Sequence, residues 1–210
     1  MPTSLARYFV RRPMRYQSND KSVLRSRLLT VRRGLSSADR ERAGEAYVRV
    51  AGGLPETERA SVVCGYASFG SEPPTWALLE RLAGRGVRVL LPVLCPDLDL
   101  DWAEYEEGLT RAIAGGGARP GPIEPATPRL GTGAISTADV VLAPGLAVDR
   151  SGVRLGRGGG SYDRALARVR PDAFVAVLLY DGELLDAVPH ETHDQRVSAA
   201  ITPTGVHRFG

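Results

Sequence analysis

The sequence is poor in cysteine, contains a single lysine and has no long apolar run. Its two cysteines, Cys64 and Cys95, lie far apart without a CxxC spacing, so neither a disulfide scaffold nor a cysteine-rich zinc site is expected. Each lies in an apolar run, which predicts small core residues in a reduced, cytoplasmic protein. No apolar stretch approaches the roughly 20 residues that cross a bilayer, so we expect no membrane partner.

The positive charge is almost entirely arginine, because Lys21 is the only lysine. The formal net charge is +3, and a modest excess of this kind suits either a nucleic acid or a small anionic ligand. A protein that binds nucleic acid through its arginines would do so in a salt-dependent manner. The arginines are scattered along the chain, so we expect no nucleic-acid partner.

The first 19 residues are rich in arginine and lack the apolar core and cleavage site of a secretory signal. We expect 1–19 to be a disordered basic extension; alternatively the start codon is misplaced and the true start is Met14. A transit peptide is the alternative. Residues 20–210 fit one domain of a size that buries a sufficient core, without an internal repeat, and the oligomeric state that we favour is a monomer.

Apolar strands alternate with amphipathic helices along this domain. The patterns predict helices over 20–34, 36–52, 75–83 and 161–169. Strands are predicted over 61–67, 87–93, 99–105 at an edge, 138–144, 173–179 and 197–202. The remaining polar, glycine- or proline-rich segments read as loops: 68–74, 94–99, 115–133 and 145–160. This order indicates a single-domain α/β fold with a largely parallel sheet flanked by helices, in which ligands sit at the carboxyl ends of the strands.

The segment from Pro144 to Arg164 carries the clearest chemical pattern. After a predicted strand, four glycines are interleaved with two arginines just before a helix: Arg154, Gly156, Arg157, Gly158, Gly159 and Gly160. Glycines let backbone N–H groups approach an anion, and guanidinium groups bind phosphate oxygens in pairs. The segment matches neither the GK[ST] nor the GxGxxG pattern. It predicts a phosphate site, the alternative being a connecting loop with solvated arginines.

The whole run from Arg154 to Asp163, RLGRGGGSYD, resembles the RLGRGKGYYD-like loop of the 5-formyltetrahydrofolate cyclo-ligase family. Three further segments follow the family's order. KSVLR (21–25) resembles its N-terminal K..LR motif, SEPPT (71–75) its E-x-x-T segment, and HETHD (190–194) the segment near its C-terminus that supplies a second metal-binding aspartate. The resemblance covers about residues 20–200, with Gly159 and Ser161 standing where the family has lysine and tyrosine.

This resemblance implies an enzyme that converts 5-formyltetrahydrofolate to 5,10-methenyltetrahydrofolate with ATP and Mg²⁺, through a phosphorylated formyl intermediate, releasing ADP and phosphate. Its partners would be a folate and MgATP. It assigns ATP binding to Lys21, Arg25, Arg154, Leu155, Gly156, Arg157, Gly158, Gly159, Gly160, Ser161 and Tyr162. It assigns the folate to Phe69, Glu72, Arg157, Ser161 and Tyr162, catalysis to Arg157 and Tyr162, and the metal to Asp163 and Asp194.

Several single residues leave two interpretations open. Trp102 and Tyr105 either line a folate slot or, as we favour, pack on the core. His190 and His193 lie beside Asp194, but Mg²⁺ prefers oxygen ligands, so only the aspartate is expected to bind it. Asp149 is either a general acid or a turn former, and the composition of DRSG (149–152) favours the turn.

Two alternative enzymes remain beside the cyclo-ligase. One is a paralogue of the family that binds ATP or folate but catalyses a different reaction. The other is a sugar-phosphate isomerase-like enzyme, because such enzymes share the α/β layout and need no ATP.

Overall fold

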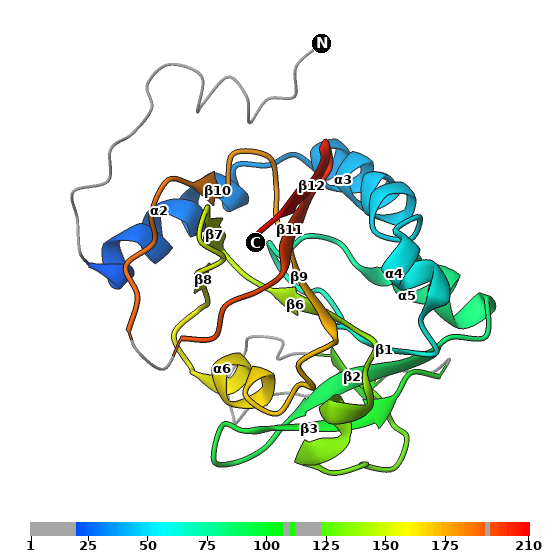
Figure 1. The fold of residues 1–210 in the computed structure, drawn as a ribbon. Helices are drawn as coiled ribbons and strands as arrows, with labels where there is room; N and C mark the ends of the chain where they lie inside the picture. The colour runs from blue at the N-terminus through cyan, green and yellow to red at the C-terminus, as the bar shows by residue number, and fades with distance from the viewer. Residues whose placement is uncertain (1–19, 107–109, 112–122, 192–193) are drawn as a thin grey trace.

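The computed structural model describes residues 20–106, 110–111, 123–191 and 194–210, and the predicted extension 1–19 lies outside them (Figure 1). The helices are α2 (Lys21–Arg33), α3 (Ser37–Val50), α4 (Pro55–Arg59), α5 (Trp76–Gly84) and α6 (Ser161–Leu166), with a 3-10 helix η1 (Thr132–Thr137). The longer strands are β1 (Val62–Cys64), β2 (Arg88–Leu94), β3 (Leu100–Glu104), β6 (Val140–Pro144), β9 (Phe174–Leu178), β11 (Ala199–Thr202) and β12 (Gly205–Arg208). The predicted helices and strands are therefore present, most of them shorter by a few residues.

These strands form one seven-stranded sheet in the order β12-β11-β9-β6-β1-β2-β3. The five central strands run parallel, whereas β3 and β12 pair antiparallel at the two edges. The predicted α/β fold with a largely parallel sheet is thus confirmed, as is the edge position of 99–105. Because the central strands are parallel, their carboxyl ends meet along one side of the sheet, where α/β proteins bind ligands.

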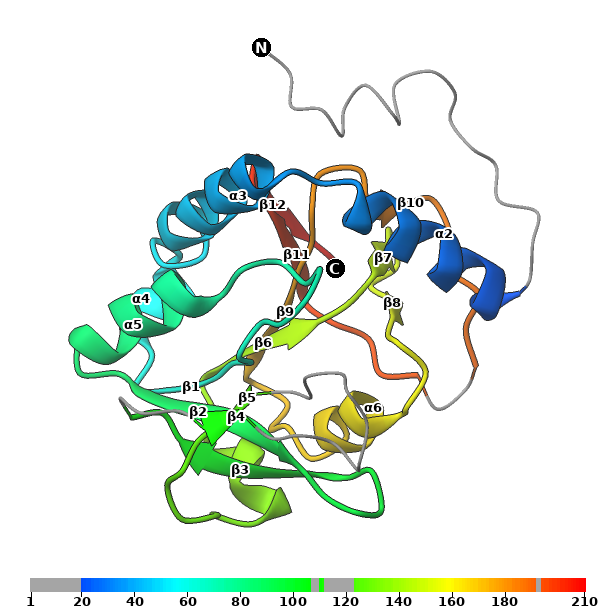
Figure 2. The ribbon, with the colours of Figure 1, turned by 180° about the vertical axis from the view of Figure 1, so that it is seen from behind.

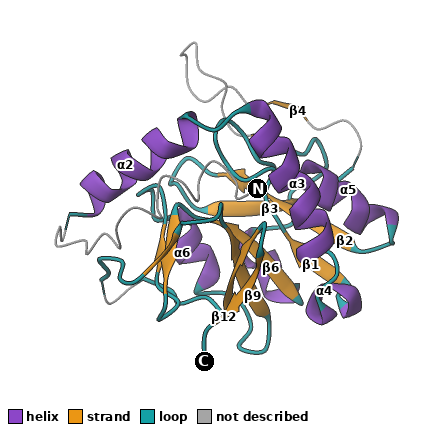
Figure 3. Ribbon diagram, turned by 90° about the horizontal axis from the view of Figure 1, so that it is seen from above, coloured by secondary structure: helices purple, strands orange, loops and turns teal. Residues whose placement is uncertain are grey.

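Helices cover both faces of the sheet, which explains why the central strands are apolar on both sides. Figures 2 and 3 show α3, α4 and α5 together on one face and α6 on the other. Alternate residues of each strand serve the two layers. Val63 and Leu91 pack in the cluster under α3 and α5, whereas Cys64 and Leu90 join the cluster that contains Trp102. Trp102 is fully buried, and Tyr105 packs against the core as favoured.

Helix α2 lies apart from the main layers, beside a small second sheet made of β7 (Ala147–Asp149), β8 (Arg154–Leu155) and β10 (Leu184–Leu185) (Figure 2). Asp20 caps the helix by accepting a 2.7 Å hydrogen bond from the backbone N–H of Ser22. Leu24 and Leu28 of the helix pack against residues of the small sheet. This packing fixes the N-terminal half of α2 over the segment that follows β6.

Three expectations need correction. The segment 145–160 is not wholly a loop, because it contains β7 and β8, which are too short to show a period in the sequence. The predicted loop 115–133 includes β5 (Ile123–Glu124), paired with β4 (Thr110–Arg111), while 112–122 lie outside the described residues. Cys64 is buried, but Cys95 is only half-buried and lies outside the core clusters. Among the described residues, no helix is both long and apolar enough to cross a bilayer.

Asp149 is a turn former, as the composition of its segment indicates. Its buried carboxylate accepts hydrogen bonds from the N–H and hydroxyl of Ser151, from the N–H of Val153 and from the N–H of Val188. These bonds close the β7–β8 turn and tie it to the chain after β10. They also hold the pKa of Asp149 below its ordinary value, although burial opposes the shift.

We expect Asp149→Ala to lower the free energy of unfolding by about 2–4 kcal/mol, because several buried N–H groups lose their acceptor. Denaturant unfolding measures the loss. Asp186→Ala is the control, because Asp186 belongs to an exposed ion pair with Arg150, and such pairs contribute about 1 kcal/mol or less. Equal losses in the two variants would contradict a structural role for Asp149.

Candidate functional site

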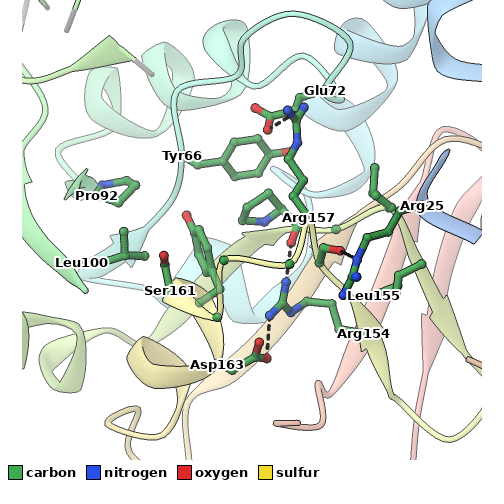
Figure 4. A pocket seen from close by; sticks show the side chains of 18 of the residues that line it. Arg25, Tyr66, Glu72, Pro92, Leu100, Arg154, Leu155, Arg157, Ser161 and Asp163 are labelled. Carbon is green, nitrogen blue, oxygen red and sulfur yellow. Dashed lines mark hydrogen bonds and ion pairs between the residues drawn. The ribbon is translucent and has the colours of Figure 1, made fainter. Parts of the chain in front are cut away.

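A cavity of about 420 Å³ opens at the carboxyl ends of the central strands, a volume typical of small-molecule sites. Its walls come from several parts of the chain: both ends of α2, the loop after β1, the end of β2 and the start of β3, β5, the segment after β6 that leads into α6, and residues 191 and 194. Figure 4 shows the apolar side chains of Pro92 and Leu100 on one side and the guanidinium of Arg25 on the other. The cavity therefore has a cationic end and an apolar end.

All the residues that the sequence predicted for the site line this one cavity: Lys21, Arg25, Phe69, Glu72, Arg154, Leu155, Gly156, Arg157, Gly158, Gly159, Gly160, Ser161, Tyr162, Asp163 and Asp194. Their individual roles stay predictions. The structure adds residues that sequence reasoning missed, namely Arg32, Tyr66, Ala67, Pro92, Leu94, Leu100, Ile123, Glu124, Pro144, Gly145, Leu146 and Glu191. Most of these are apolar and carry no chemical signal of their own. Glu191 lay within the HETHD segment.

Residues 156–160, called the glycine loop below, include two with backbone dihedral angles that residues other than glycine rarely adopt. Gly158 has φ +104° and Gly160 has φ +70°, both in the left-handed region that favours glycine. Arg25 braces the loop from α2 by donating a 2.9 Å hydrogen bond from Nε to the carbonyl of Gly156. A Cβ at Gly158 would lie 3.4 Å from the Arg25 guanidinium. The absence of side chains here leaves the loop backbone open to the cavity, as a phosphate-binding loop requires.

Arg154 and Arg157 serve different ends of the site. Arg154 is almost buried in the cavity wall, where it binds Asp163 at 2.7 Å and the carbonyl of Pro144 at 3.2 Å. Arg157 is 43% exposed and forms a 3.2 Å ion pair with Glu72 (Figure 4). Its guanidinium also lies 5.1 Å from the centre of the Phe69 ring. Arg157 thus connects the glycine loop with the loop after β1.

Glu72 and Tyr162 are the polar groups with the most unusual surroundings. Burial raises the pKa of the Glu72 carboxyl, and the neighbouring Arg157 only partly offsets this shift. Burial also raises the pKa of Tyr162, so its hydroxyl keeps its proton. Within the described part of the chain, that buried hydroxyl has no hydrogen-bond partner. Because buried polar atoms are normally paired, the hydroxyl is suited to a bound molecule.

Lys21 lies between two carboxylates at the cationic end. Its Nζ donates to Asp194 at 2.8 Å and to Glu191 at 3.0 Å. Burial disfavours the ammonium, but these hydrogen bonds outweigh it and raise the pKa of Lys21. The segment 190–194 is thereby attached to the start of α2, although it is 170 positions or so away in sequence.

The carboxylates of Asp163 and Asp194 both line the cavity, as the metal prediction requires. The residues that the structure describes contain no cluster of three or more acidic, histidine or cysteine side chains that could hold a metal alone. Mg²⁺ is commonly bound through one or two carboxylates together with water and substrate phosphates. His190 is not among the residues that line the cavity, and His193 lies outside the described residues.

Comparison with known proteins gives a consistent result. Residues 17–203 match the model of the 5-formyltetrahydrofolate cyclo-ligase family. The chain is 45% identical over 188 residues to the 5-formyltetrahydrofolate cyclo-ligase of Mycolicibacterium smegmatis, covering 87% of this chain and 93% of that one. It is 29% identical over 185 residues to the Escherichia coli enzyme of the same name, covering 83% and 96%.

Solved structures agree in fold. The 5,10-methenyltetrahydrofolate synthetase of Aquifex aeolicus superimposes with a TM-score of 0.74 at 27% identity, covering 90% of this chain and 92% of that one. The corresponding synthetase of Mycoplasma pneumoniae gives a TM-score of 0.67 at 19% identity, covering 87% and 98%, and so supports the fold alone.

We expect Gly158→Ala to weaken the binding of inorganic tripolyphosphate at least about tenfold, because alanine adopts the left-handed φ of this position only with strain. Isothermal titration calorimetry measures the affinity. Gly133→Ala is the control, since a Cβ there meets nothing within 4 Å. Unchanged affinity in Gly158→Ala would show that the loop does not hold phosphate.

Proposed function

The chain belongs to the 5-formyltetrahydrofolate cyclo-ligase family. We propose that its cavity binds ATP and 5-formyltetrahydrofolate together and catalyses the ATP-dependent closure to 5,10-methenyltetrahydrofolate. One observation supports this most: the glycine loop and Glu72 line the same cavity and are joined by Arg157. A triphosphate and a folate can therefore meet within it. Family membership sets aside the sugar-phosphate isomerase alternative.

The cationic end is the place for the triphosphate. Lys21, Arg25 and Arg157 line the cavity next to the open backbone of residues 156–160. Lysine and arginine side chains together with loop N–H groups are the donors that phosphate oxygens need. The residues present thus fit ATP. Lys21, at the start of α2, supplies a positive charge to the phosphates, whereas Gly159 of the loop has no side chain and can supply only its backbone N–H.

Asp163 and Asp194 would hold Mg²⁺, which supplies neutralisation of phosphate charge when bound. In the structure each carboxylate is bound by a cation of the protein, Asp163 by Arg154 and Asp194 by Lys21. These contacts fix the positions of the two carboxylates. They also balance the charge of the site before a substrate enters.

The apolar end is the place for the pterin ring of the folate. Phe69, Pro92 and Leu100 offer flat or apolar contact surface, and Glu72 offers a buried carboxylate that accepts N–H groups. Tyr162 adds a hydroxyl whose hydrogen-bonding capacity is not used by the described residues. Ser161 lines the same wall at the start of α6.

The reaction then needs little covalent chemistry from the protein. The formyl oxygen attacks the γ-phosphorus as its bond to ADP breaks. The N10 lone pair next attacks the activated formyl carbon, and the formyl oxygen leaves as part of inorganic phosphate while N10 loses its proton. Arg157 is placed to neutralise charge on the transferred phosphoryl group, and the cavity walls hold the two reactants together. No enzyme nucleophile is required.

We expect purified protein to form methenyl product from 5-formyltetrahydrofolate only with ATP and Mg²⁺, and Arg157→Ala to lower kcat at least about 10²-fold, because phosphoryl charge loses its counterion. Absorbance of the methenyl product measures both. Arg88→Ala is a matched control: Arg88 has the same 43% exposure and also pairs with a glutamate, but lies outside the cavity. Equal activity of the two variants would refute the role of Arg157.

The raised pKa of Glu72 predicts that folate binding weakens at acidic pH. Because burial places this pKa above the ordinary 4.5, the carboxylate becomes protonated as the pH falls through the raised value, and it then loses its ability to accept pterin N–H groups. KM for 5-formyltetrahydrofolate should therefore rise on acidification. Glu72→Gln should raise KM roughly tenfold or more at neutral pH and remove the further rise at acidic pH. If KM still rises at acidic pH in Glu72→Gln, the pH dependence arises from another group.

A further inference from the structure

A buried polar network reaches the cavity wall at Arg32 and is not explained by the roles given above. Arg32 of α2 and Glu183, which follows β9, form an ion pair in which both side chains are 1% exposed. The guanidinium donates to both carboxylate oxygens at 2.7 Å and to the carbonyl of Gly145 at 2.6 Å. Burial opposes the charge on Arg32, but the adjacent carboxylate outweighs it and raises the pKa of the guanidinium. The pair therefore joins α2 to the ends of β6 and β9.

Tyr180 connects this network to Glu72, at the proposed folate end of the cavity. Its backbone N–H donates to Glu183 at 2.8 Å, and its ring lies 5.4 Å below the Arg32 guanidinium. Its hydroxyl donates a 3.0 Å hydrogen bond to the backbone carbonyl of Glu72. The side chain is 1% exposed and does not line the cavity. Tyr180 thus touches the residue that faces the pterin but not the pterin site itself.

This contact matters because Glu72 lies in an irregular segment between β1 and α5, and such loops move unless they are held. The Glu72 side chain accepts a hydrogen bond from the N–H of Phe69 at 3.2 Å and pairs with Arg157. Both partners belong to the cavity and face incoming ligands. The bond from Tyr180 fixes the main chain of Glu72 from the protein interior, where no ligand competes for it.

We propose that Tyr180 is a positioning residue that sets folate affinity by holding the backbone of Glu72, and that it connects this residue to α2 through Glu183 and Arg32. The inference rests on the proposed function, because it takes Glu72 as the group that binds the pterin. Burial raises the pKa of Tyr180 to about 12. The hydroxyl therefore keeps its proton at neutral pH and can donate it to the Glu72 carbonyl.

The test compares Tyr180→Phe with Tyr47→Phe. The Tyr47 hydroxyl is also buried and also donates to a backbone carbonyl, that of Leu179 at 2.7 Å, one residue before Tyr180. Both variants lose one buried hydrogen bond, so they should lose similar stability. Only Tyr180→Phe should raise KM and Kd for 5-formyltetrahydrofolate, by about three- to tenfold, with KM for ATP unchanged within about twofold.

A second arm repeats Tyr180→Phe in the Glu72→Gln background. If Tyr180 acts through the Glu72 carboxylate, its effect on the folate Kd shrinks markedly there, as coupled residues require. An undiminished effect in this background, or equal folate affinities of Tyr180→Phe and Tyr47→Phe, would overturn the inference.

The binding measurement separates this inference from the proposed function. If the unchanged protein binds 5-formyltetrahydrofolate but forms no methenyl product, the proposed function fails and the Kd comparison still tests Tyr180. If the unchanged protein binds no folate, both fail together. Should Tyr180→Phe not fold while Tyr47→Phe does, Tyr180 is a stability residue and the inference is overturned.

Discussion

The site depends first on the buried ion pair between Arg32 and Glu183. Moving two charges out of water is costly, and the cost is offset only when geometry and additional hydrogen bonds are good. Here two short bonds join the pair, the Gly145 carbonyl accepts a third, and the Tyr180 N–H satisfies the carboxylate. The pair fixes the C-terminal end of α2 against the carboxyl ends of β6 and β9. Lys21 and Arg25, earlier on the same helix, are thereby directed at the cavity.

Charge balance is the second constraint. Three cationic side chains that line the cavity each form an ion pair with a carboxylate: Lys21 with Asp194, Arg154 with Asp163, and Arg157 with Glu72. We propose that an incoming triphosphate, which brings several negative charges, is met by the exposed Arg157 and the ammonium of Lys21, both of which line the cavity. In the proposed assignment of the site, the Arg157–Glu72 pair places the cation that binds phosphate beside the carboxylate that binds the folate. This juxtaposition suits a reaction that joins a phosphoryl group to a folate oxygen.

Much of the fold could be predicted from the sequence because its signals are local. The parallel strands appear as short apolar runs, and the edge strand over 99–105 alternates between polar and apolar residues. The strands β7, β8 and β10 were missed because two or three residues show no period.

The site was predictable to the extent that its residues form a motif. The glycine loop and the three shorter segments predicted the cationic residues of the site and Glu72. The structure brings these residues into one cavity. The apolar wall could not be predicted, since Pro92 and Leu100 resemble any core residue in sequence. Nor could the pairing of Arg32 with Glu183, which lie 151 positions apart. Long-range contacts of buried charges depend on the tertiary fold, which one sequence does not reveal.

A crystal structure of the protein with 5-formyltetrahydrofolate, Mg²⁺ and a non-hydrolysable ATP analogue tests the two-ended cavity most directly. We expect the γ-phosphate to lie against residues 156–160 and Arg157, the metal on Asp163 and Asp194, and the pterin against Glu72, with the formyl oxygen facing the γ-phosphorus. A triphosphate bound away from the glycine loop, or a folate bound outside this cavity, would contradict it.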